Sequence, residues 1–326
     1  MQIGIIGCGL VGCKRAKAVA PQHKIKWAAD LRLEAAESLA RISPGAKATT
    51  DWQEVIADRS VDAVLVSTTH DVLPVIALAA IDSGKHVLLE KPGARSFEEL
   101  KPLRTAARKK GVTVKVGFNH RFHPAIRKAK EIFDSGALGE PMYVRGRYGH
   151  GGRVGYDKEW RAIPEISGGG ELLDQGLHLI DLSRWFLGDL EVIEGLTATY
   201  FWDMEVEDNA FLMLKTLTGQ IAWLHASCTE WKNLFSFEVY GRRGKLQIDG
   251  LGGSYGVEKL THYRMLPLMG PPETTIWEYP SADDSWAEEF NEFAKAIIQK
   301  REPLGNLADA EAALDIVDKI YAKVPK

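Results

Sequence analysis

Residues 2–12, QIGIIGCGLVG, form a short apolar run that ends in a G-x-G-x-x-G sequence, and a helical pattern follows to about Ala20. In a turn of this kind each glycine has a function. Gly7 makes the tight bend, Gly9 lets a pyrophosphate approach the backbone, and Gly12 lets the helix pack on the strand. The N-terminus of the helix receives the phosphate charge. The stretch therefore predicts the strand, turn and helix that open a dinucleotide-binding domain.

A second apolar run, Ile25–Ala29, ends at Asp30. Asp30 follows Gly12 by 18 residues, close to the spacing of about 20 at which a carboxylate accepts the adenosine ribose hydroxyls. A carboxylate there also repels the 2′-phosphate of NADP, so we predict NAD as the cofactor. Arg32 could tolerate that phosphate, which leaves NADP open. The alternative is a glycine turn beside a solvated aspartate.

Three further apolar strands are expected in the first 120 residues, at 63–67, 86–89 and 112–116. Helical patterns separate them, and strands that alternate with helices indicate a parallel, doubly wound Rossmann sheet, an α/β fold. Ligands bind such a sheet outside the carboxyl ends of its strands. The residues at those ends are Ser67, Thr68, Thr69 and His70, then Glu90, Lys91 and Pro92, and finally Asn119, His120 and Arg121.

Two of the intervening helices carry capping signals. Asp71 is expected to be the N-cap of a helix that runs to Ser83. Ser96 and Glu99 form a capping box for a second helix. Gly111 is expected to end that helix.

Lys91 is the most informative of the residues at the strand ends. Packing poorly explains a lysine that faces a cofactor crevice. Its ammonium could donate a hydrogen bond to a substrate oxygen and stabilise alkoxide charge. Pro92 holds Lys91 extended, through a cis or a trans bond. The alternative is a solvated lysine before a turn.

The stretch at 167–189, SGGGELLDQGLHLIDLSRWFLGD, reads as a buried helix, because apolar residues lie along two of its flanks. Asp174, His178 and Asp181 nevertheless form one polar stripe at helical spacing, with Trp185 a turn beyond. A buried Asp or His needs a partner, since leaving it without one costs about 1–3 kcal/mol. This stretch alone fits a structural His–Asp pair as well as a catalytic one.

The bulk properties exclude several classes of protein. A length of 326 residues suggests about two domains, and 45% hydrophobic with 26% charged residues is ordinary for a globular protein. The net charge of −3 argues against a nucleic-acid partner. Cys8, Cys13 and Cys228 suggest neither a disulfide framework nor a metal site. Because no apolar run is long enough for a membrane and Met1 leads directly into a strand, we expect a cytoplasmic protein.

Three motifs now stand in order: GCGLVG at 7–12, Glu90-Lys91-Pro92, and GGGELLDQGLHLID at 168–181. Together they resemble the glucose–fructose oxidoreductase, inositol dehydrogenase and rhizopine-catabolism (Gfo/Idh/MocA) family, and the resemblance spans the chain. It implies a second domain with a large, open, mainly antiparallel sheet that often forms subunit contacts. It also implies NAD(P)-dependent oxidation or reduction at a carbon of a sugar, cyclitol or sugar derivative.

The resemblance also assigns residues. The family's catalytic lysine, aspartate and histidine map onto Lys91, Asp174 and His178. Thr68-Thr69-His70 stand where the family commonly has a proline, so cofactor contacts in that loop are less secure. The cofactor-binding residues expected are Gly7, Gly9, Leu10, Val11, Gly12, Asp30, Leu31, Ser67, Thr68, His70, Glu90, Lys91, Asn119, Trp160 and Arg161; those expected to bind substrate are Arg121, Tyr148, His150, Trp160 and Trp231.

The second half of the chain predicts a separate domain, so we assign 1–120 to cofactor binding and 121–326 to an α+β domain for substrate binding and oligomer contacts. Strands are expected at 142–150, 192–202, 210–217, 220–228, 235–240 and 245–248, followed by helices at 285–300 and 307–323. Trp223 and His225 alternate on one strand face, and such a face usually needs a cover. We therefore expect a homodimer or homotetramer.

These features predict an NAD-linked dehydrogenase or reductase that acts on a secondary alcohol of a sugar, nucleotide sugar or cyclitol. His178 would remove the hydroxyl proton, Lys91 would stabilise the alkoxide, and Asp174 would orient the site or share in the proton relay. Their convergence requires the helix stripe to face the carboxyl ends of the first domain's strands. Two alternatives remain: a glycoside hydrolase that uses bound NAD for transient oxidation, and a regulator that binds a dinucleotide without catalysis. The sequence does not name the substrate, the carbon oxidised or the direction.

Overall fold

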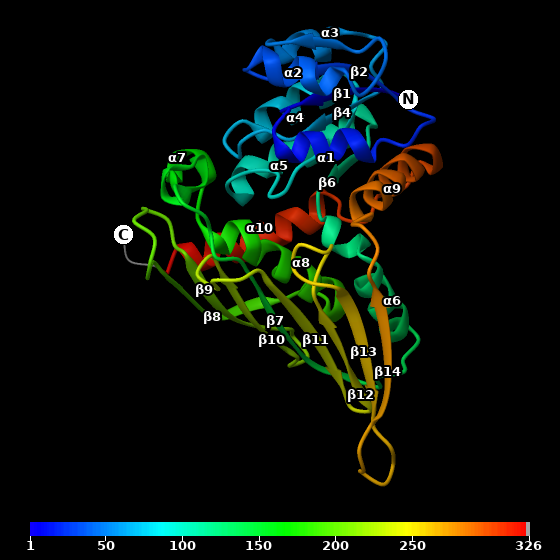
Figure 1. Cartoon of the computed structure of the whole chain (residues 1–326), viewed down its shortest axis with the longest axis vertical. Coiled ribbons are helices and arrows are strands. Elements are labelled where there is room, and N and C mark those ends of the chain that lie inside the picture. The colour runs from blue at the N-terminus through cyan, green and yellow to red at the C-terminus, as the bar shows by residue number, and fades with distance from the viewer. Residues whose placement is uncertain (324–326) are drawn as a thin grey trace. The chain divides into compact units, whose positions relative to one another are not determined.

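The computed structural model describes residues 1–323 of the chain. By its internal contacts the chain divides into two compact units. Unit 1 comprises Met1–Asn119 and Trp286–Glu311, and unit 2 comprises His120–Ser285 and, among the described residues, 312–323. The predicted partition at residue 120 assigned both closing helices to the second domain, whereas the contacts place residues 286–311 in unit 1. Figure 1 labels most of the helices and strands of both units.

Unit 1 contains a six-stranded sheet in the order β3-β2-β1-β4-β5-β6, and every strand pair in it is parallel. The runs of β1, β4 and β5 are short, apolar and almost completely buried, as expected for strands covered on both faces. The predicted doubly wound α/β fold is confirmed. The strands are β1 (Gln2–Ile6), β2 (Lys24–Ala29), β3 (Lys47–Thr49), β4 (Ala63–Val66), β5 (His86–Leu89) and β6 (Val114–Val116).

The helix caps of unit 1 confirm one prediction and correct another. The Ser96 side chain accepts a hydrogen bond from the Glu99 amide, and Gly111 ends the helix with a φ of 67°. Asp71 is not an N-cap, because its helix begins two residues later, with Pro74 in the first turn, where a missing amide hydrogen costs nothing. The helices are α1 (Leu10–Ala18), α2 (Leu33–Ala40), α3 (Trp52–Ala57), α4 (Leu73–Asp82) and α5 (Phe97–Lys110); of these, α2 and α3, with the short strand β3, were not predicted.

Helix α9 (Ser285–Gln299) completes the core of unit 1. Its Phe290 and Phe293 are fully buried in the cluster that contains Ile3 and Ile5 of β1. Burial of such side chains is the main favourable term in folding. A segment that begins 169 residues after the end of β6 (from Val116 to Ser285) therefore belongs to the nucleotide-binding fold.

Unit 2 contains one eight-stranded sheet in the order β14-β13-β12-β11-β7-β10-β9-β8. Only the pair β7–β10 is parallel, so the predicted mainly antiparallel sheet is confirmed. The last two strands were not predicted, since both are rich in polar residues and β14 is largely exposed. The strands are β7 (Pro141–Gly149), β8 (Glu191–Ala198), β9 (Asn209–Lys215), β10 (Ile221–Ser227), β11 (Leu234–Gly241), β12 (Gly244–Asp249), β13 (Glu258–Arg264) and β14 (Glu273–Tyr279).

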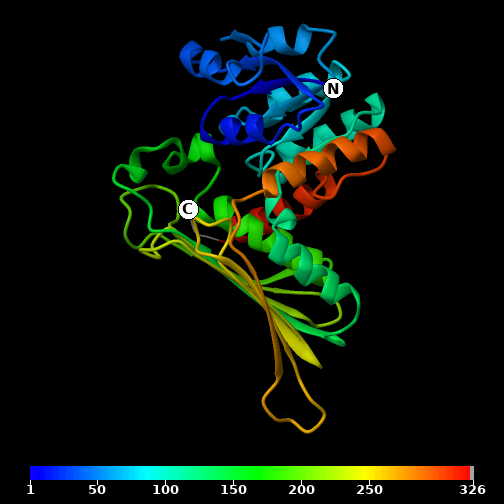
Figure 2. The ribbon, with the colours of Figure 1, turned by 45° about the vertical axis from the view of Figure 1, so that its right-hand side comes forward.

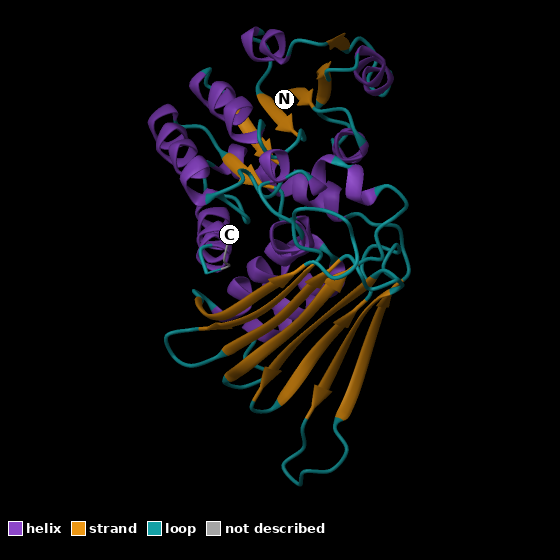
Figure 3. Ribbon diagram, turned by 90° about the vertical axis from the view of Figure 1, so that its left-hand side faces the viewer, coloured by secondary structure: helices purple, strands orange, loops and turns teal. Residues whose placement is uncertain are grey.

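The two faces of this sheet differ. Helices α6 (Pro124–Asp134) and α8 (Leu177–Leu187) pack on one face, and the helix α10 (Leu307–Tyr321) places Ile320 against Gly195 of β8. Within the described residues of unit 2 no helix covers the opposite face, and in Figure 3 the helices of this unit lie behind the sheet. The loop between β13 and β14 extends beyond the end of the sheet (Figure 2).

Short helical turns connect β7 to α8. They are two 3-10 turns at Tyr156–Lys158 and Trp160–Ala162, and α7 (Pro164–Ser167); a further 3-10 turn at Asn119–Phe122 lies between β6 and α6. The central stretch is not one regular helix as predicted: Leu172–Gly176 forms a π turn, and α8 follows directly. π turns inside helices occur frequently at functional sites. No helix in the described part of the chain has both the length and the apolar composition that crossing a bilayer requires.

Candidate functional site

The G-x-G-x-x-G turn has the geometry that a pyrophosphate needs. A Cβ on Gly7 would lie 2.4 Å from the Ser67 carbonyl oxygen, and one on Gly12 would lie 1.9 Å from the Gly7 carbonyl oxygen. A Cβ on Gly9 would meet nothing within 4 Å. Packing therefore requires Gly7 and Gly12, whereas Gly9 leaves open space beside the backbone. The turn fits a dinucleotide, and α1 begins immediately after it at Leu10.

Asp30 lies beside this turn. Its carboxylate accepts hydrogen bonds from the Cys8 amide at 2.8 Å and from the Arg32 amide at 3.0 Å. The Arg32 Nε atom is 3.6 Å from the same carboxylate, on a largely exposed side chain. These contacts hold Asp30 next to the bend at Gly7 and Gly9, as an interaction with the adenosine ribose would require.

The other residues predicted to bind the cofactor in unit 1 follow the carboxyl ends of the parallel strands. Ser67, Thr68 and His70 follow β4, Glu90 and Lys91 follow β5, and Asn119 follows β6. Because parallel strands end at one edge of a sheet, these residues share that edge with the glycine turn after β1. The Lys91–Pro92 bond is cis. Assignment of cofactor contacts to these residues, and to Leu31, stays a prediction.

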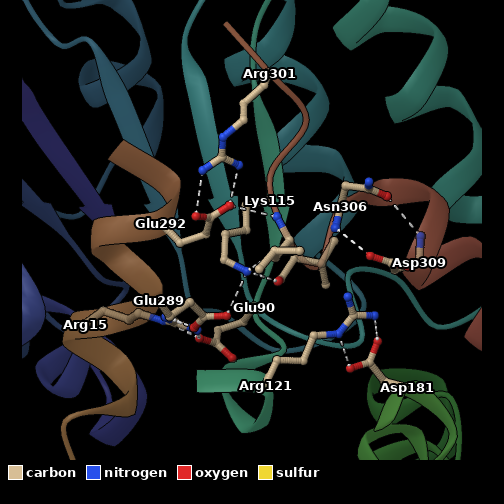
Figure 4. A network of polar contacts seen from close by, with 12 residues as sticks. Arg15, Glu90, Lys115, Arg121, Asp181, Glu289, Glu292, Arg301, Asn306 and Asp309 are labelled. Atoms are coloured by element: carbon tan, nitrogen blue, oxygen red, sulfur yellow. Dashed lines mark hydrogen bonds and ion pairs between the residues drawn. The ribbon is translucent and has the colours of Figure 1, made fainter. Parts of the chain in front are cut away.

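Glu90 has a structural partner. Its buried carboxylate accepts a hydrogen bond from Arg15 of α1, which also binds Glu289 of α9 (Figure 4). Burial raises the pKa of Glu90, and the positive charge of Arg15 opposes that rise. The Glu90 side chain is therefore engaged by the protein, immediately before Lys91.

In unit 2 the residues of the polar stripe have different neighbours. Asp181 is fully buried and accepts two hydrogen bonds from Arg121, Nε to Oδ2 at 2.8 Å and a second at 2.6 Å (Figure 4). The Arg121 guanidinium also lies 5.5 Å from the centre of the Trp185 ring. The prediction that Arg121 binds substrate gains no support from this arrangement, since the guanidinium is held by a buried carboxylate.

His178 belongs to a cluster of rings. Its imidazole stacks on that of His120, with centroids 3.7 Å apart and planes inclined by 22°. Tyr148, predicted to bind substrate, meets His120 edge-on at 5.0 Å and His178 at 6.0 Å. Tyr148 in turn hydrogen-bonds Tyr255, which lies in the Gly-rich segment at 250–256. No role was predicted for His120 or Tyr255, and neither belongs to a motif of its own.

Asp174, in the π turn, pairs with the loop that precedes the helix. The Arg161 Nε atom lies 3.3 Å from Asp174 Oδ2. The Arg161 guanidinium also lies 4.4 Å from the centre of the Trp160 ring, a cation–π contact. The Trp160-Arg161 pair therefore lies beside one of the two predicted catalytic residues of this unit.

A second buried cluster precedes the π turn. Tyr156 donates a hydrogen bond to Glu171 at 3.0 Å, and His150 Nε2 is 3.7 Å from the same carboxylate oxygen. Burial, and after it the charge of Glu171, raises the pKa of Tyr156. Glu171 and Tyr156 were missed as site residues, although the position of Glu171 after the glycine triplet was a usable signal. Trp231, by contrast, is exposed and touches only the edge of Phe201 among the described ring contacts.

A distant carboxylate holds the start of the π turn. Glu207 accepts hydrogen bonds from the amides of Gly170 and Leu172, at 3.1 and 3.0 Å, and from the Tyr321 hydroxyl at 2.7 Å. A Cβ on Gly170 would lie 2.0 Å from the Glu207 carbonyl oxygen. The glycine triplet therefore serves close packing. Within residues 1–323 no cluster of His, Cys, Asp and Glu is arranged to hold a metal ion.

Comparison with known proteins supports the resemblance over both halves of the chain. Residues 1–118 match the oxidoreductase family, NAD-binding Rossmann fold, and residues 126–247 match the GFO/IDH/MocA C-terminal domain. Levoglucosan dehydrogenase from Pseudarthrobacter phenanthrenivorans is 26% identical, over 100% of this chain and 96% of that protein. The scyllo-inositol 2-dehydrogenase (NAD(+)) of Bacillus subtilis is 25% identical, over 97% and 92%.

The fold agrees as well. A structure of levoglucosan dehydrogenase in complex with NADH and levoglucosan has a TM-score of 0.88 with this chain, at 24% identity, and the match covers 99% of this chain and 96% of that one. The glycine turn, the sheet orders of both units and the two family matches together lead to one assignment. The chain is an NAD-binding oxidoreductase of the Gfo/Idh/MocA family.

Proposed function

We propose that this protein transfers a hydride between NAD and a secondary alcohol, or the corresponding ketone, of a sugar, nucleotide sugar or cyclitol. The observation that carries the proposal is a set of three residues. Lys91 lies at the sheet edge that bears the dinucleotide turn, and Asp174 and His178 lie one turn apart on the buried stripe of unit 2. A protein that bound a dinucleotide without catalysis would need none of the three.

Each side chain has one role in the proposed reaction. In the oxidative direction the His178 imidazole removes the proton from the hydroxyl group. The Lys91 ammonium donates a hydrogen bond to the same oxygen and stabilises the negative charge that develops on it. Asp174, held by Arg161, orients the site or passes the proton on. When bound, NAD takes up the hydride from the substrate carbon.

The substrate class rests on the residues around this stripe and on the named relatives. Tyr255 and Trp160, both partly exposed, provide flat apolar surfaces, and His150 provides a hydrogen-bonding group. Such a combination suits a ring that carries several hydroxyl groups. Relatives named for levoglucosan and scyllo-inositol act on ligands of this kind, so we place the substrate among them.

A panel of substrates tests the proposal. Free sugars, anhydrosugars, inositols and nucleotide sugars are each incubated with NAD, and NADH formation is followed at 340 nm. We expect turnover with at least one polyol ring. Release of a sugar from a glycoside without accumulation of NADH would instead identify the hydrolase alternative, and binding of NAD without any turnover would favour a regulator.

Cofactor preference gives a first prediction. Asp30→Ala removes the carboxylate that would bind the ribose hydroxyls and repel a 2′-phosphate, while Arg32 stays in place. We expect the ratio of NADP to NAD affinity to rise at least tenfold, as measured by calorimetry with both dinucleotides. Asp51→Ala, which alters a carboxylate that caps α3, is the control. Tighter binding of NADP than of NAD by the unmodified protein would contradict the role given to Asp30.

Assembly gives a second prediction. The uncovered face of the unit 2 sheet carries Trp223, which is 55% exposed, and the partly exposed Phe211, Met213 and Tyr143. Large apolar side chains on one open face mark an interaction site, so we propose a homodimer or homotetramer formed through it. Trp223→Asp should shift the mass measured by light scattering toward that of a monomer. Ile298→Asp, a change at an exposed position of α9, should leave the mass unchanged. A monomeric unmodified protein at micromolar concentration would refute the proposal.

We place the protein in the cytoplasm. Its three cysteines, Cys8, Cys13 and Cys228, are free thiols, as is usual in a reducing compartment. Burial raises the pKa of Cys8 to about 12, so this thiol stays protonated at neutral pH.

A further inference from the structure

Unit 1 buries four charged side chains in one network. Arg15 of α1 and Lys115 of β6 are the cations, and Glu90 after β5 and Glu289 of α9 are the carboxylates (Figure 4). The exposed fraction of Arg15 is 1%, and those of Lys115 and Glu289 are 0%. A buried charge is tolerated only when it is paired and hydrogen-bonded. The two positive and two negative charges balance, so the removal of any one of these side chains leaves a buried charge of the opposite sign without its partner.

Glu289 is the residue that joins the cations. One oxygen binds the Arg15 guanidinium, and the other lies 3.2 Å from Lys115 Nζ. Lys115 also donates hydrogen bonds to the carbonyl oxygens of Leu304 and, at 3.3 Å, Val116. A helix from the C-terminal part of the chain is thereby attached to the dinucleotide helix and to the sheet.

Arg15 has no room to move within this network. Its guanidinium lies between two carboxylates and 4.5 Å from the centre of the Trp286 ring. A Cβ on Gly117 would lie 2.6 Å from Arg15 Nη2 and 3.1 Å from Glu90 Oε2. The Arg15–Glu90 pair therefore packs directly on the backbone that follows β6, and only glycine leaves space for it.

The network ends at the residue before Lys91. The Glu90 amide donates to the Val66 carbonyl at 2.9 Å, and the Gly117 amide donates to the Leu89 carbonyl at 2.8 Å. These bonds fix the backbone of the strand end, and Arg15 fixes the Glu90 side chain. We infer that Arg15 and Glu289 are positioning residues. They hold the end of β5 and Glu90 in place, so that the backbone at Lys91 keeps a single conformation. The inference rests on the proposed function, because it assigns the network a purpose only if Lys91 acts on substrate.

Glu289→Gln tests the inference, because it keeps the shape of the side chain and removes its charge. We expect kcat on the substrate found in the panel to fall at least tenfold, with the Kd for NAD within threefold of the unmodified value. Amide hydrogen exchange of the peptide at 88–93, measured without substrate, should become faster. Glu289→Asp keeps the charge but shortens the side chain by one methylene group, and its kcat should fall less than that of Glu289→Gln.

Lys85→Met is the matched control. Lys85 is buried at the other end of β5, where its ammonium donates to the carbonyls of Asp58 and Val61 at 2.8 and 2.9 Å. The change should lower Tm without a comparable fall in kcat and without faster exchange at 88–93. Equal losses of kcat in Glu289→Gln and Lys85→Met at equal Tm would overturn the inference.

A charge-balanced double variant separates positioning from stability. Glu289→Gln with Lys115→Met leaves one cation, Arg15, and one carboxylate, Glu90. We expect Tm to recover while kcat stays low, since Glu289 no longer holds Arg15. Recovery of kcat together with Tm would show that the network serves stability alone. Lys91→Ala is measured in the same series. If it retains full turnover, the proposed function itself fails; if it is inactive while Glu289→Gln is fully active, only the positioning inference fails.

Discussion

Lys91→Ala and His178→Ala should each lower kcat by about 10²–10⁴-fold, the usual scale for lost oxyanion or acid–base assistance. Removing Lys91 takes away the cation that would stabilise the developing alkoxide, and removing His178 takes away the group that would accept the proton. The Kd for NAD should change little, because neither side chain is placed at the pyrophosphate turn. Steady-state rates and calorimetry of NAD binding measure the two quantities separately.

The combined variant shows whether the two residues act on one substrate. If Lys91 and His178 serve the same proton transfer, the loss in the double variant should be smaller than the product of the single losses. His262→Ala, in β13 of the same unit as His178, is the control for removal of a partly buried histidine and should leave kcat nearly unchanged. A His178→Ala enzyme with near-full turnover on its true substrate would end the assignment.

Asp181→Ala should be the most destabilising single change in unit 2. It removes the carboxylate that holds Arg121 and leaves a guanidinium buried without it, which costs about 3–5 kcal/mol in comparable sites. Urea unfolding of the two proteins side by side measures the difference. Asp315→Ala breaks an exposed pair with Lys319 and should cost about 1 kcal/mol or less.

The double variant Arg121→Met with Asp181→Leu distinguishes the role of Arg121. A buried ion pair replaced by apolar side chains of similar volume is often neutral for stability. We therefore expect the free energy of unfolding to recover. If Arg121 also bound substrate, the KM of this double variant would be higher than that of the unmodified protein, although stability returns. A KM equal to that of the unmodified protein would confine Arg121 to a structural role. A loss below about 1 kcal/mol in Asp181→Ala would contradict the importance given to the pair.

The sequence by itself determined the features that depend on neighbours along the chain. The glycine turn at 7–12 was predicted because one bend, one close approach and one helix contact each need a glycine, and the structure shows the two contacts that packing demands. The Ser96 cap was predicted because its hydrogen bond closes within three residues. Helical spacing also predicted that His178 and Asp181 lie on one side of α8, whereas the π turn that holds Asp174 was not predicted.

Only the tertiary structure decided which partner each buried polar group has. The pairing of Asp181 with Arg121, the stacking of His178 on His120 and the hold of Glu207 on the π turn join segments separated by tens of residues. Helix α9 has an ordinary amphipathic sequence, and nothing in it indicates that Glu289 pairs with Arg15. Local patterns report hydrogen bonds that close within a turn and the period of apolar residues. A buried charge needs a partner because folding removes its hydration. Which partner it finds depends on all the segments that the fold brings around it.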